Sequence, residues 1–244
     1  MWFDESAVDS VAGAIPVWAA VLLVFVSYLG SIYLIMPTAV YVYLRHSDAR
    51  TATWPAVMLG AYALFVALKP LSDVSRPAER GVESPLAGES LPVVLDTLHR
   101  FAVEFDTGSF PSGHAIAITV FWGLVVADLD IGSRTQRLAV AVAWVAAVLF
   151  SRVALGTHYV GDVVGGVLVA GLFLAVVFTL RRALDRSPRG LGAVEGLAAL
   201  AAVPALAAVP LGRPLEGALL LGALAGVALV HRWLEPRDIA LPPW

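Results

Sequence analysis

Three short polar stretches of the sequence hold residues that could do chemistry together. His158 and Asp162 are four residues apart in SRVALGTHYVGD, so on a helical turn the carboxylate can accept the Nδ1 proton of the histidine. That hydrogen bond would leave the Nε2 lone pair as a nucleophile, following the logic of serine–histidine–aspartate triads. A second histidine, His114, ends the stretch PSGH and could protonate a leaving alkoxide, then deprotonate a water. This pattern indicates attack of His158 on phosphorus and a phosphohistidine intermediate.

The same stretches supply the charges that a phosphate group needs. Lys69, Arg76 and Arg152 are three cations that the topology places at one membrane depth. An arginine can donate two parallel hydrogen bonds to phosphate oxygens, and a lysine adds a compact positive charge. The backbone N–H groups of residues 112–114 are expected to point outward from the start of a helix, where anions bind readily. We therefore predict a phosphate site without a metal and without another cofactor.

The amino-acid composition indicates whether these residues lie in a soluble or a membrane protein. The 244 residues are 59% hydrophobic and 14% charged, with a mean hydropathy of +0.82. Soluble domains are about 45–50% apolar and about 25% charged, so the chain is predicted to be an integral membrane protein. The sequence has no cysteine, which excludes disulfides, thiolate metal sites and cysteine nucleophiles. The net charge is −3 and no basic run suggests a nucleic-acid partner.

Apolar segments long enough to cross a membrane predict the fold. A span needs about 20 apolar residues, and shorter ones can be buried inside a bundle. We predict an all-α, polytopic membrane helical bundle with six or seven transmembrane helices, because the last two candidates are separated only by a short loop. The candidates run near 15–44 (kinked at Pro37), 52–68, 114–129, 138–154, 159–180, 191–210 and 215–231.

Basic loop residues predict the orientation, because arginine and lysine are retained on the cytoplasmic side. Most of the 16 basic residues fall in four segments that alternate onto one face: Arg45 and Arg50; Arg134 and Arg137; Arg181, Arg182, Arg186 and Arg189; Arg232 and Arg237. The opposite face holds Lys69, Arg76, Arg80, Arg100, Arg152 and Arg213. We predict a multi-pass protein of the cell membrane whose active site is on the extracytoplasmic face.

The long external loop, residues 69–113, contains one ordered segment. In LPVVLDTLHRFAVEF, residues 91–105, the apolar residues recur at helical spacing along one face. This pattern is typical of a short amphipathic helix on the membrane surface, and a helix packed over the bundle fits equally well.

The three stretches together resemble the motifs of a known family. Lys69 and Arg76-Pro77 have K-x6-RP spacing, residues 111–114 are PSGH, and residues 151–162 follow SR-x5-H-x3-D. This arrangement resembles the type 2 phosphatidic acid phosphatase superfamily of membrane lipid phosphatases, which is related to the vanadium haloperoxidases. The resemblance implies that His158 is the nucleophile, Asp162 its partner and His114 the acid and base. It also implies metal-free catalysis and a set of phosphate-binding residues: Lys69, Arg76, Ser112, Gly113 and Arg152.

The predicted function is hydrolysis of a phosphomonoester or diphosphate headgroup of a membrane lipid. Candidate substrates are phosphatidic acid, phosphatidylglycerol phosphate and polyprenyl diphosphate; the oligomeric state is left open. Alternatives on the same fold are a lipid phosphotransferase, a vanadate-dependent haloperoxidase and a catalytically silent transporter or scaffold. We interpret residues 1–244 as one membrane domain with a catalytic core at 52–180, and the added hairpin at 191–231 departs from a six-span core.

Overall fold

The computed structural model describes residues 2–46, 48–104, 107–185 and 192–234, and every regular element in these ranges is a helix. Residue 191, where the predicted hairpin begins, lies outside the described residues, as do Arg186, Arg189 and Arg237. The α-helices are α1 (Glu5–Gly13), α2 (Val17–Tyr28), α3 (Ile32–Arg45), α4 (Trp54–Leu68), α5 (Val93–Val103), α6 (Gly113–Asp128), α7 (Arg134–Ala154), α8 (Val160–Asp185), α9 (Ala193–Ala208) and α10 (Pro214–Leu234). Three short 3₁₀ helices are η1 (Thr51–Thr53), η2 (Lys69–Leu71) and η3 (Pro77–Arg80).

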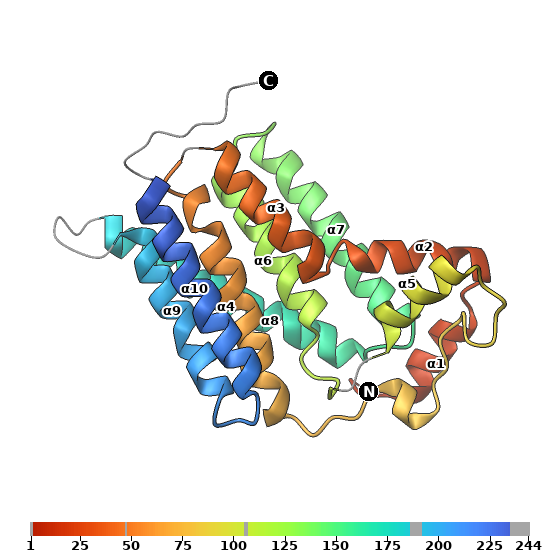
Figure 1. Ribbon diagram of the computed structural model, residues 1–244. Coiled ribbons are helices and arrows are strands. Elements are labelled where there is room, and N and C mark those ends of the chain that lie inside the picture. The colour runs from red at the N-terminus through yellow and green to blue at the C-terminus, as the bar shows by residue number, and fades with distance from the viewer. Residues whose placement is uncertain (1, 47, 105–106, 186–191, 235–244) are drawn as a thin grey trace.

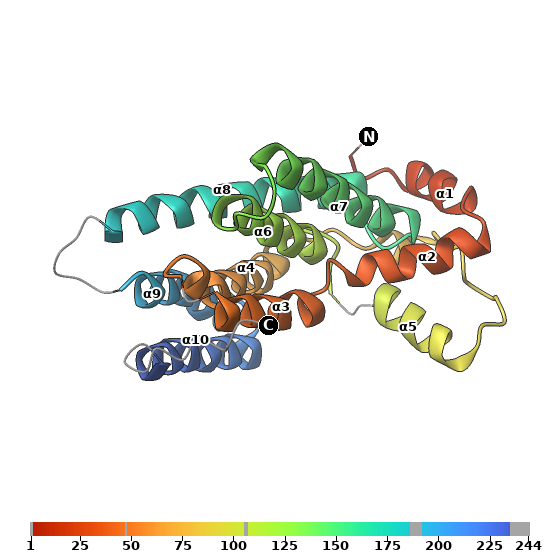
Figure 2. The same ribbon diagram turned by 90° about the horizontal axis from the view of Figure 1, so that it is seen from above.

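Helix α4 lies at the centre of the bundle, where it packs against α3, α6, α9 and α10 (Figure 1). Trp54 and Met58 of α4 are fully buried and pack in one core with Ile116 and Leu124 of α6. Helix α8 contacts α6 from behind α4, and α7 packs on α6 and α2 (Figures 1 and 2). The predicted all-α membrane bundle is confirmed.

The outer surface of the bundle is apolar. Leu168 and Leu172 of α8 and Leu219 and Leu229 of α10 are all more than 60% exposed. Large exposed apolar side chains of this kind are typical of a helical bundle in a hydrocarbon environment. Four helical segments are long and apolar enough to span a membrane, or five if the sharply bent pair α1 and α2 is one span. Helices α3, α6 and α9 are apolar but shorter, so the count of six or seven spans stays a prediction.

The predicted first span, residues 15–44, is wrong as a single helix. The chain breaks between α2 and α3 at Leu29–Ser31, whereas Pro37 lies inside the continuous helix α3. Gly30 allows a close approach here, because a Cβ on it would lie 2.5 Å from Val148 Cγ1 and 3.4 Å from His114 Cδ2. Ser31 then caps α3 by accepting the Tyr33 N–H at 3.3 Å. The break therefore turns α2 away from α3, so that it lies beside α7 and α5 (Figure 1).

The helix predicted in the external loop is present as α5. It packs on α2, where the Tyr28 hydroxyl donates to the Leu98 carbonyl at 2.9 Å. Val93 and Phe101 of α5 are more than 70% exposed, while His99 is buried against Ser84 at 2.8 Å. The exposed apolar face is consistent with a helix at the membrane interface, and that location stays a prediction.

Candidate active site

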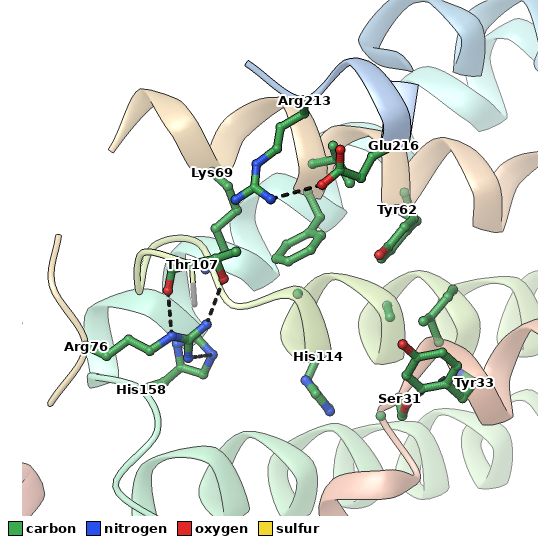
Figure 3. A pocket seen from close by; sticks show the side chains of 17 residues that line it. Ser31, Tyr33, Tyr62, Lys69, Arg76, Thr107, His114, His158, Arg213 and Glu216 are labelled. Atoms are coloured by element: carbon green, nitrogen blue, oxygen red, sulfur yellow. Dashed lines mark hydrogen bonds and ion pairs between the residues drawn. The ribbon is translucent and has the colours of Figure 1, made fainter. Parts of the chain in front are cut away.

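Helix ends from four parts of the chain meet at one end of the bundle. Lys69 follows the last residue of α4, Arg76 precedes η3, and His114 is in the first turn of α6. Arg152 is in the last turn of α7, and the loop after α7 carries His158 to the start of α8. The sequence-predicted residues are thus brought into one neighbourhood, and Figure 3 shows several of them around a shared cavity.

The His158 and Asp162 side chains form the pair that their spacing predicts. The Nδ1 and Oδ2 atoms are 3.1 Å apart, and both residues are at most 2% exposed. The same Oδ2 accepts the Tyr159 N–H at 2.8 Å, so Asp162 also caps the start of α8. With Asp162 as an acceptor, Nδ1 carries the proton and the Nε2 lone pair faces away from the carboxylate.

Arg76 occupies the other side of the His158 ring. Its Nε donates to the Thr107 carbonyl at 2.7 Å, and its Nη1 donates to the Thr157 carbonyl at 3.1 Å. Nη1 also lies 3.4 Å from His158 Nε2 (Figure 3). Burial lowers the pKa of His158 well below its usual value, and the Arg76 charge lowers it further. His158 is therefore neutral at pH 7, with its lone pair beside a guanidinium that matches phosphate oxygens.

Lys69 is 3% exposed and is held by backbone carbonyls. Its ammonium donates to the Gly108 oxygen at 2.5 Å and the Ser109 oxygen at 2.9 Å. It also lies 5.3 Å from the centre of the Phe65 ring. An ammonium has three N–H donors, so two bonds to carbonyls leave one for a ligand in the cavity.

Ser112 and Gly113 differ in part from their predicted roles. The Ser112 N–H donates to the Asp162 carbonyl at 3.1 Å, so the expectation that it points outward to an anion is wrong. The Ser112 hydroxyl is fully buried, has no hydrogen-bond partner among the described residues and is not among the residues that line the cavity, so its contact with phosphate stays a prediction. Gly113 lines the cavity, and a Cβ on it would lie 2.8 Å from the Phe65 ring. The glycine is therefore required for the packing of α6 on α4.

Arg152 is fully buried at the end of α7 and is not among the residues that line the cavity. Its Nη1 donates to the Ser27 hydroxyl of α2 at 2.5 Å. The structure therefore places this arginine outside the cavity lining, and its charge helps to lower the pKa of His158. Its direct contact with phosphate stays a prediction.

The cavity itself has a volume of about 330 Å³ and joins a polar end to an apolar one. His158, Arg76 and Lys69 line the polar end, and His114 points into it from α6 (Figure 3). The remaining wall is largely apolar or aromatic and includes Ile32, Ala61, Tyr62, Phe65, Val66 and Ala117. Tyr33 of α3, also in the wall, is 85% exposed, so this edge reaches the outer surface of the bundle. The cavity can hold a phosphate at one end and the start of a hydrocarbon chain at the other.

The structure adds site residues that the sequence did not predict. The Ser109 hydroxyl donates to Asp162 Oδ2 in a short hydrogen bond and lies 3.4 Å from His158 Nδ1. Its signal was its place in GSFPSGH, two residues before the PSGH motif. Arg213 and Glu216 also line the cavity, from the C-terminal hairpin formed by α9 and α10. No local pattern connects that hairpin to the motifs, so only the tertiary structure reveals these two residues.

Comparison with known proteins agrees with this arrangement of helix ends and charges. The model of the PAP2 superfamily matches residues 50–186, which is more than half of the chain, so the protein belongs to this superfamily. The match includes all three motifs and excludes α1 to α3, α9 and α10. No curated protein and no solved structure matches the chain. Membership supports phosphatase-type activity on phosphate esters, which is the coarse form of the function predicted from the motifs.

Proposed function

We propose that the protein is a membrane lipid phosphatase that cleaves a phosphomonoester or diphosphate headgroup through a phosphohistidine intermediate. One observation carries the proposal: His158 is held by Asp162 at Nδ1 and flanked by Arg76 at Nε2, at the polar end of a cavity whose other end is apolar. Phosphatidic acid, phosphatidylglycerol phosphate and polyprenyl diphosphate all match this combination of a terminal phosphate and a lipid tail.

In the first step, His158 Nε2 attacks the terminal phosphorus and the bond from phosphorus to the leaving oxygen breaks. The Nδ1 proton stays on the ring, and the Asp162 carboxylate stabilises the positive charge that develops there. Lys69 and Arg76 neutralise the equatorial oxygens, Arg152 adds positive charge from outside the cavity lining, the Ser112 hydroxyl is proposed to donate a hydrogen bond, and Gly113 keeps α6 close to the site. Arg76 gives up its contact with Nε2 when the phosphate binds there.

His114 completes both halves of the reaction. It donates a proton to the departing lipid oxygen, and it then accepts a proton from the water that attacks the phosphohistidine. Its place in the cavity wall at the first turn of α6 supports this role. The products are inorganic phosphate and the lipid alcohol, or the lipid monophosphate when the substrate is a diphosphate.

The site is proposed to face the extracytoplasmic side of the cell membrane. The arginine asymmetry of the loops supports this orientation. A tag at the N-terminus and a tag in the 78–90 loop should both be accessible from outside intact cells. If the 78–90 loop is labelled only after the cells are permeabilised, the loop lies inside the cell and the proposed orientation is wrong.

The direct test is hydrolysis by the purified protein of a panel of lipid phosphates and diphosphates in detergent or vesicles, with phosphate release as the readout. The expected result is release from at least one lipid and formation of a base-stable, acid-labile phosphoenzyme after an alkaline quench. Transfer of the phosphoryl group to an added alcohol in preference to water would favour the phosphotransferase. No turnover of any phosphate ester by folded protein would overturn the proposal.

A further inference from the structure

The C-terminal hairpin contributes an arginine to the wall of the reactive cavity. Arg213, in the loop between α9 and α10, and Glu216, in the first turn of α10, line the same cavity as His158 and His114. Figure 3 shows the Arg213 side chain reaching toward Lys69. The hairpin lies outside the residues that match the superfamily, so this charge is an addition to the shared catalytic core.

The backbone holds Arg213 firmly in this place. Its N–H donates to the Ala208 carbonyl at 2.9 Å, and its carbonyl accepts the Gly217 N–H at 3.0 Å. Helix α9, which carries Ala208, packs against α4 along the bundle. The start of the Arg213 side chain is therefore fixed relative to Lys69 at the end of α4.

Glu216 accepts one hydrogen bond from the Arg213 guanidinium. Arg213 Nη1 lies 3.0 Å from Glu216 Oε1, and the two side chains are 31% and 36% exposed. A guanidinium carries five N–H donors, so donors other than the one that Glu216 accepts remain for a ligand in the cavity that Arg213 lines. Partly exposed ion pairs of this kind are weak, which means that an anionic ligand can compete with Glu216 for Arg213.

Two cavities meet at Arg213. A second cavity of about 320 Å³ shares Lys69, Thr107 and Arg213 with the first. It also contains Asp73 and Glu79, whose carboxylates repel an anion. The favourable place for a second negative group is therefore the shared border, between the Lys69 ammonium and the Arg213 guanidinium.

We propose that Arg213 binds the non-reacting phosphate of a diphosphate substrate and so selects lipid diphosphates over lipid monophosphates. This inference rests on the proposed phosphatase function. His158 Nε2 bonds to the terminal phosphorus and the bridging P–O bond breaks. The bridging oxygen leaves on the lipid phosphate and takes the proton from His114. Water then releases inorganic phosphate from the histidine. A monophosphate has an uncharged carbon in place of the second phosphorus and makes no use of Arg213.

The test compares two substrates that share one tail, farnesyl diphosphate and farnesyl monophosphate. Arg213→Gln should lower kcat/KM for the diphosphate by about 10- to 100-fold, because it removes a charge-assisted hydrogen bond. For the monophosphate, kcat/KM should fall by less than about threefold. Glu216→Gln removes the competing carboxylate and should raise kcat/KM for the diphosphate. Arg213→Lys keeps the charge and should recover most of the lost preference.

Arg232 provides a matched control at the other end of the same hairpin. It pairs with Glu195 at 2.9 Å and is largely exposed, away from the cavity. Arg232→Gln removes an arginine–glutamate pair from the hairpin and should leave the diphosphate-to-monophosphate ratio as in the wild type. Thermal unfolding of each purified variant identifies any loss that comes from misfolding.

The outcomes separate the two proposals. If the wild type hydrolyses neither farnesyl substrate nor any other phosphate ester, the phosphatase function fails. Suppose instead that the wild type hydrolyses both farnesyl substrates, and that Arg213→Gln lowers kcat/KM equally for both or for neither. The phosphatase function then stands and the Arg213 subsite is overturned. If Glu216→Gln lowers kcat/KM for the diphosphate as much as Arg213→Gln does, the ion pair only stabilises the loop and the subsite is also overturned. Repeating the comparison with diacylglycerol diphosphate and phosphatidic acid shows whether prenyl or diacyl tails are accepted.

Discussion

The two ends of the central helices contrast in how they hold buried charge. At the end opposite the cavity, Arg181 of α8 donates to both oxygens of Asp128 of α6, at 2.8 and 3.1 Å. The Trp54 ring N–H of α4 donates to the same carboxylate at 2.8 Å, and Arg181 also contacts the Thr53 hydroxyl. One positive and one negative charge thus balance each other and connect three helices.

Among the described residues, the cavity end holds more buried cations than buried carboxylates. Lys69, Arg76 and Arg152 are at most 4% exposed, and Asp162 is the buried carboxylate that accompanies them. That carboxylate receives hydrogen bonds from Ser109, His158 and Tyr159 at its Oδ2 atom. Burying several cations close together costs free energy, and an anionic ligand in the cavity would recover part of it. We infer that a buried cation–carboxylate pair marks a structural link in this bundle, and that buried cations lining a cavity, such as Lys69 and Arg76, mark a binding site.

The largest expected effect comes from His158. His158→Ala should reduce turnover of every substrate to background, because it removes the nucleophile. An alkaline-quenched sample with radiolabelled substrate should contain no phosphoenzyme, while the variant keeps its folded thermal transition. A phosphohistidine in this variant would show that another residue is the nucleophile.

The next effect comes from His114 and depends on the leaving group. His114→Ala should lower turnover of a lipid phosphate by about 10²–10⁴-fold, because the lipid alkoxide needs a proton as it leaves. With p-nitrophenyl phosphate the phosphorylation step should suffer much less, since p-nitrophenolate is a weak base. Hydrolysis of the intermediate stays slow, so phosphohistidine should accumulate. If no phosphohistidine accumulates and turnover falls equally for the lipid phosphate and for p-nitrophenyl phosphate, His114 is not the acid and base.

At the balanced end, a substitution should affect stability and spare catalysis. Asp128→Ala leaves Arg181 buried without its carboxylate and should lower the free energy of unfolding by about 3–5 kcal/mol. Adding Arg181→Met should restore much of that loss. Unfolding in detergent measures both variants, and kcat at a temperature where they are folded should stay within about threefold of wild type. A large kcat loss in the folded double variant would mean that this end takes part in catalysis.

How much the sequence predicts depends on whether a feature is local. The contact between His158 and Asp162 follows from four-residue spacing on one helical turn, so it could be predicted without the tertiary structure. The short apolar segments of α6 and α9 were also located correctly, because hydrophobic length is a local signal. By contrast, the break at Leu29–Ser31 depends on how closely Gly30 approaches Val148, and Pro37 was the stronger local signal.

Residues that act through tertiary placement were missed or assigned incompletely. Arg213 was assigned only to the outer face, because nothing local indicates that the hairpin packs beside α4. The hydrogen bond from the Ser112 N–H to the Asp162 carbonyl forms only because α6 packs against α8, which the sequence does not reveal. Arg152 was predicted from its motif, but its contact with Ser27 of α2 required the fold.

Ion binding tests the cations that line the cavity, at a smaller energetic scale. Vanadate mimics pentacoordinate phosphorus, so it should inhibit activity and stabilise the folded protein, by about 2.7 kcal/mol at 100 times its Kd. Lys69→Met should abolish this stabilisation, whereas Arg232→Gln should preserve it. Activity should survive EDTA, because the proposed steps use side chains alone. Loss on chelation that magnesium restores would contradict the metal-free mechanism, and equal stabilisation of Lys69→Met would place the vanadate elsewhere.

The smallest effect is expected at Ser109, which touches the Asp162 carboxylate and not the substrate. Its hydroxyl is one of three groups that donate to Oδ2, and the Tyr159 N–H and His158 remain when it is removed. The Oδ1 atom has no hydrogen-bond partner among the described residues, so in Ser109→Ala the carboxylate can turn and weaken its hold on Nδ1. We expect kcat to fall by about three- to tenfold with little change in KM, because two of the three donors to Oδ2 remain. Ser109→Thr retains the hydroxyl and should recover most of the rate. If Ser109→Ala raises KM and leaves kcat unchanged, Ser109 acts on substrate binding, and orientation of His158 by Asp162 does not depend on it.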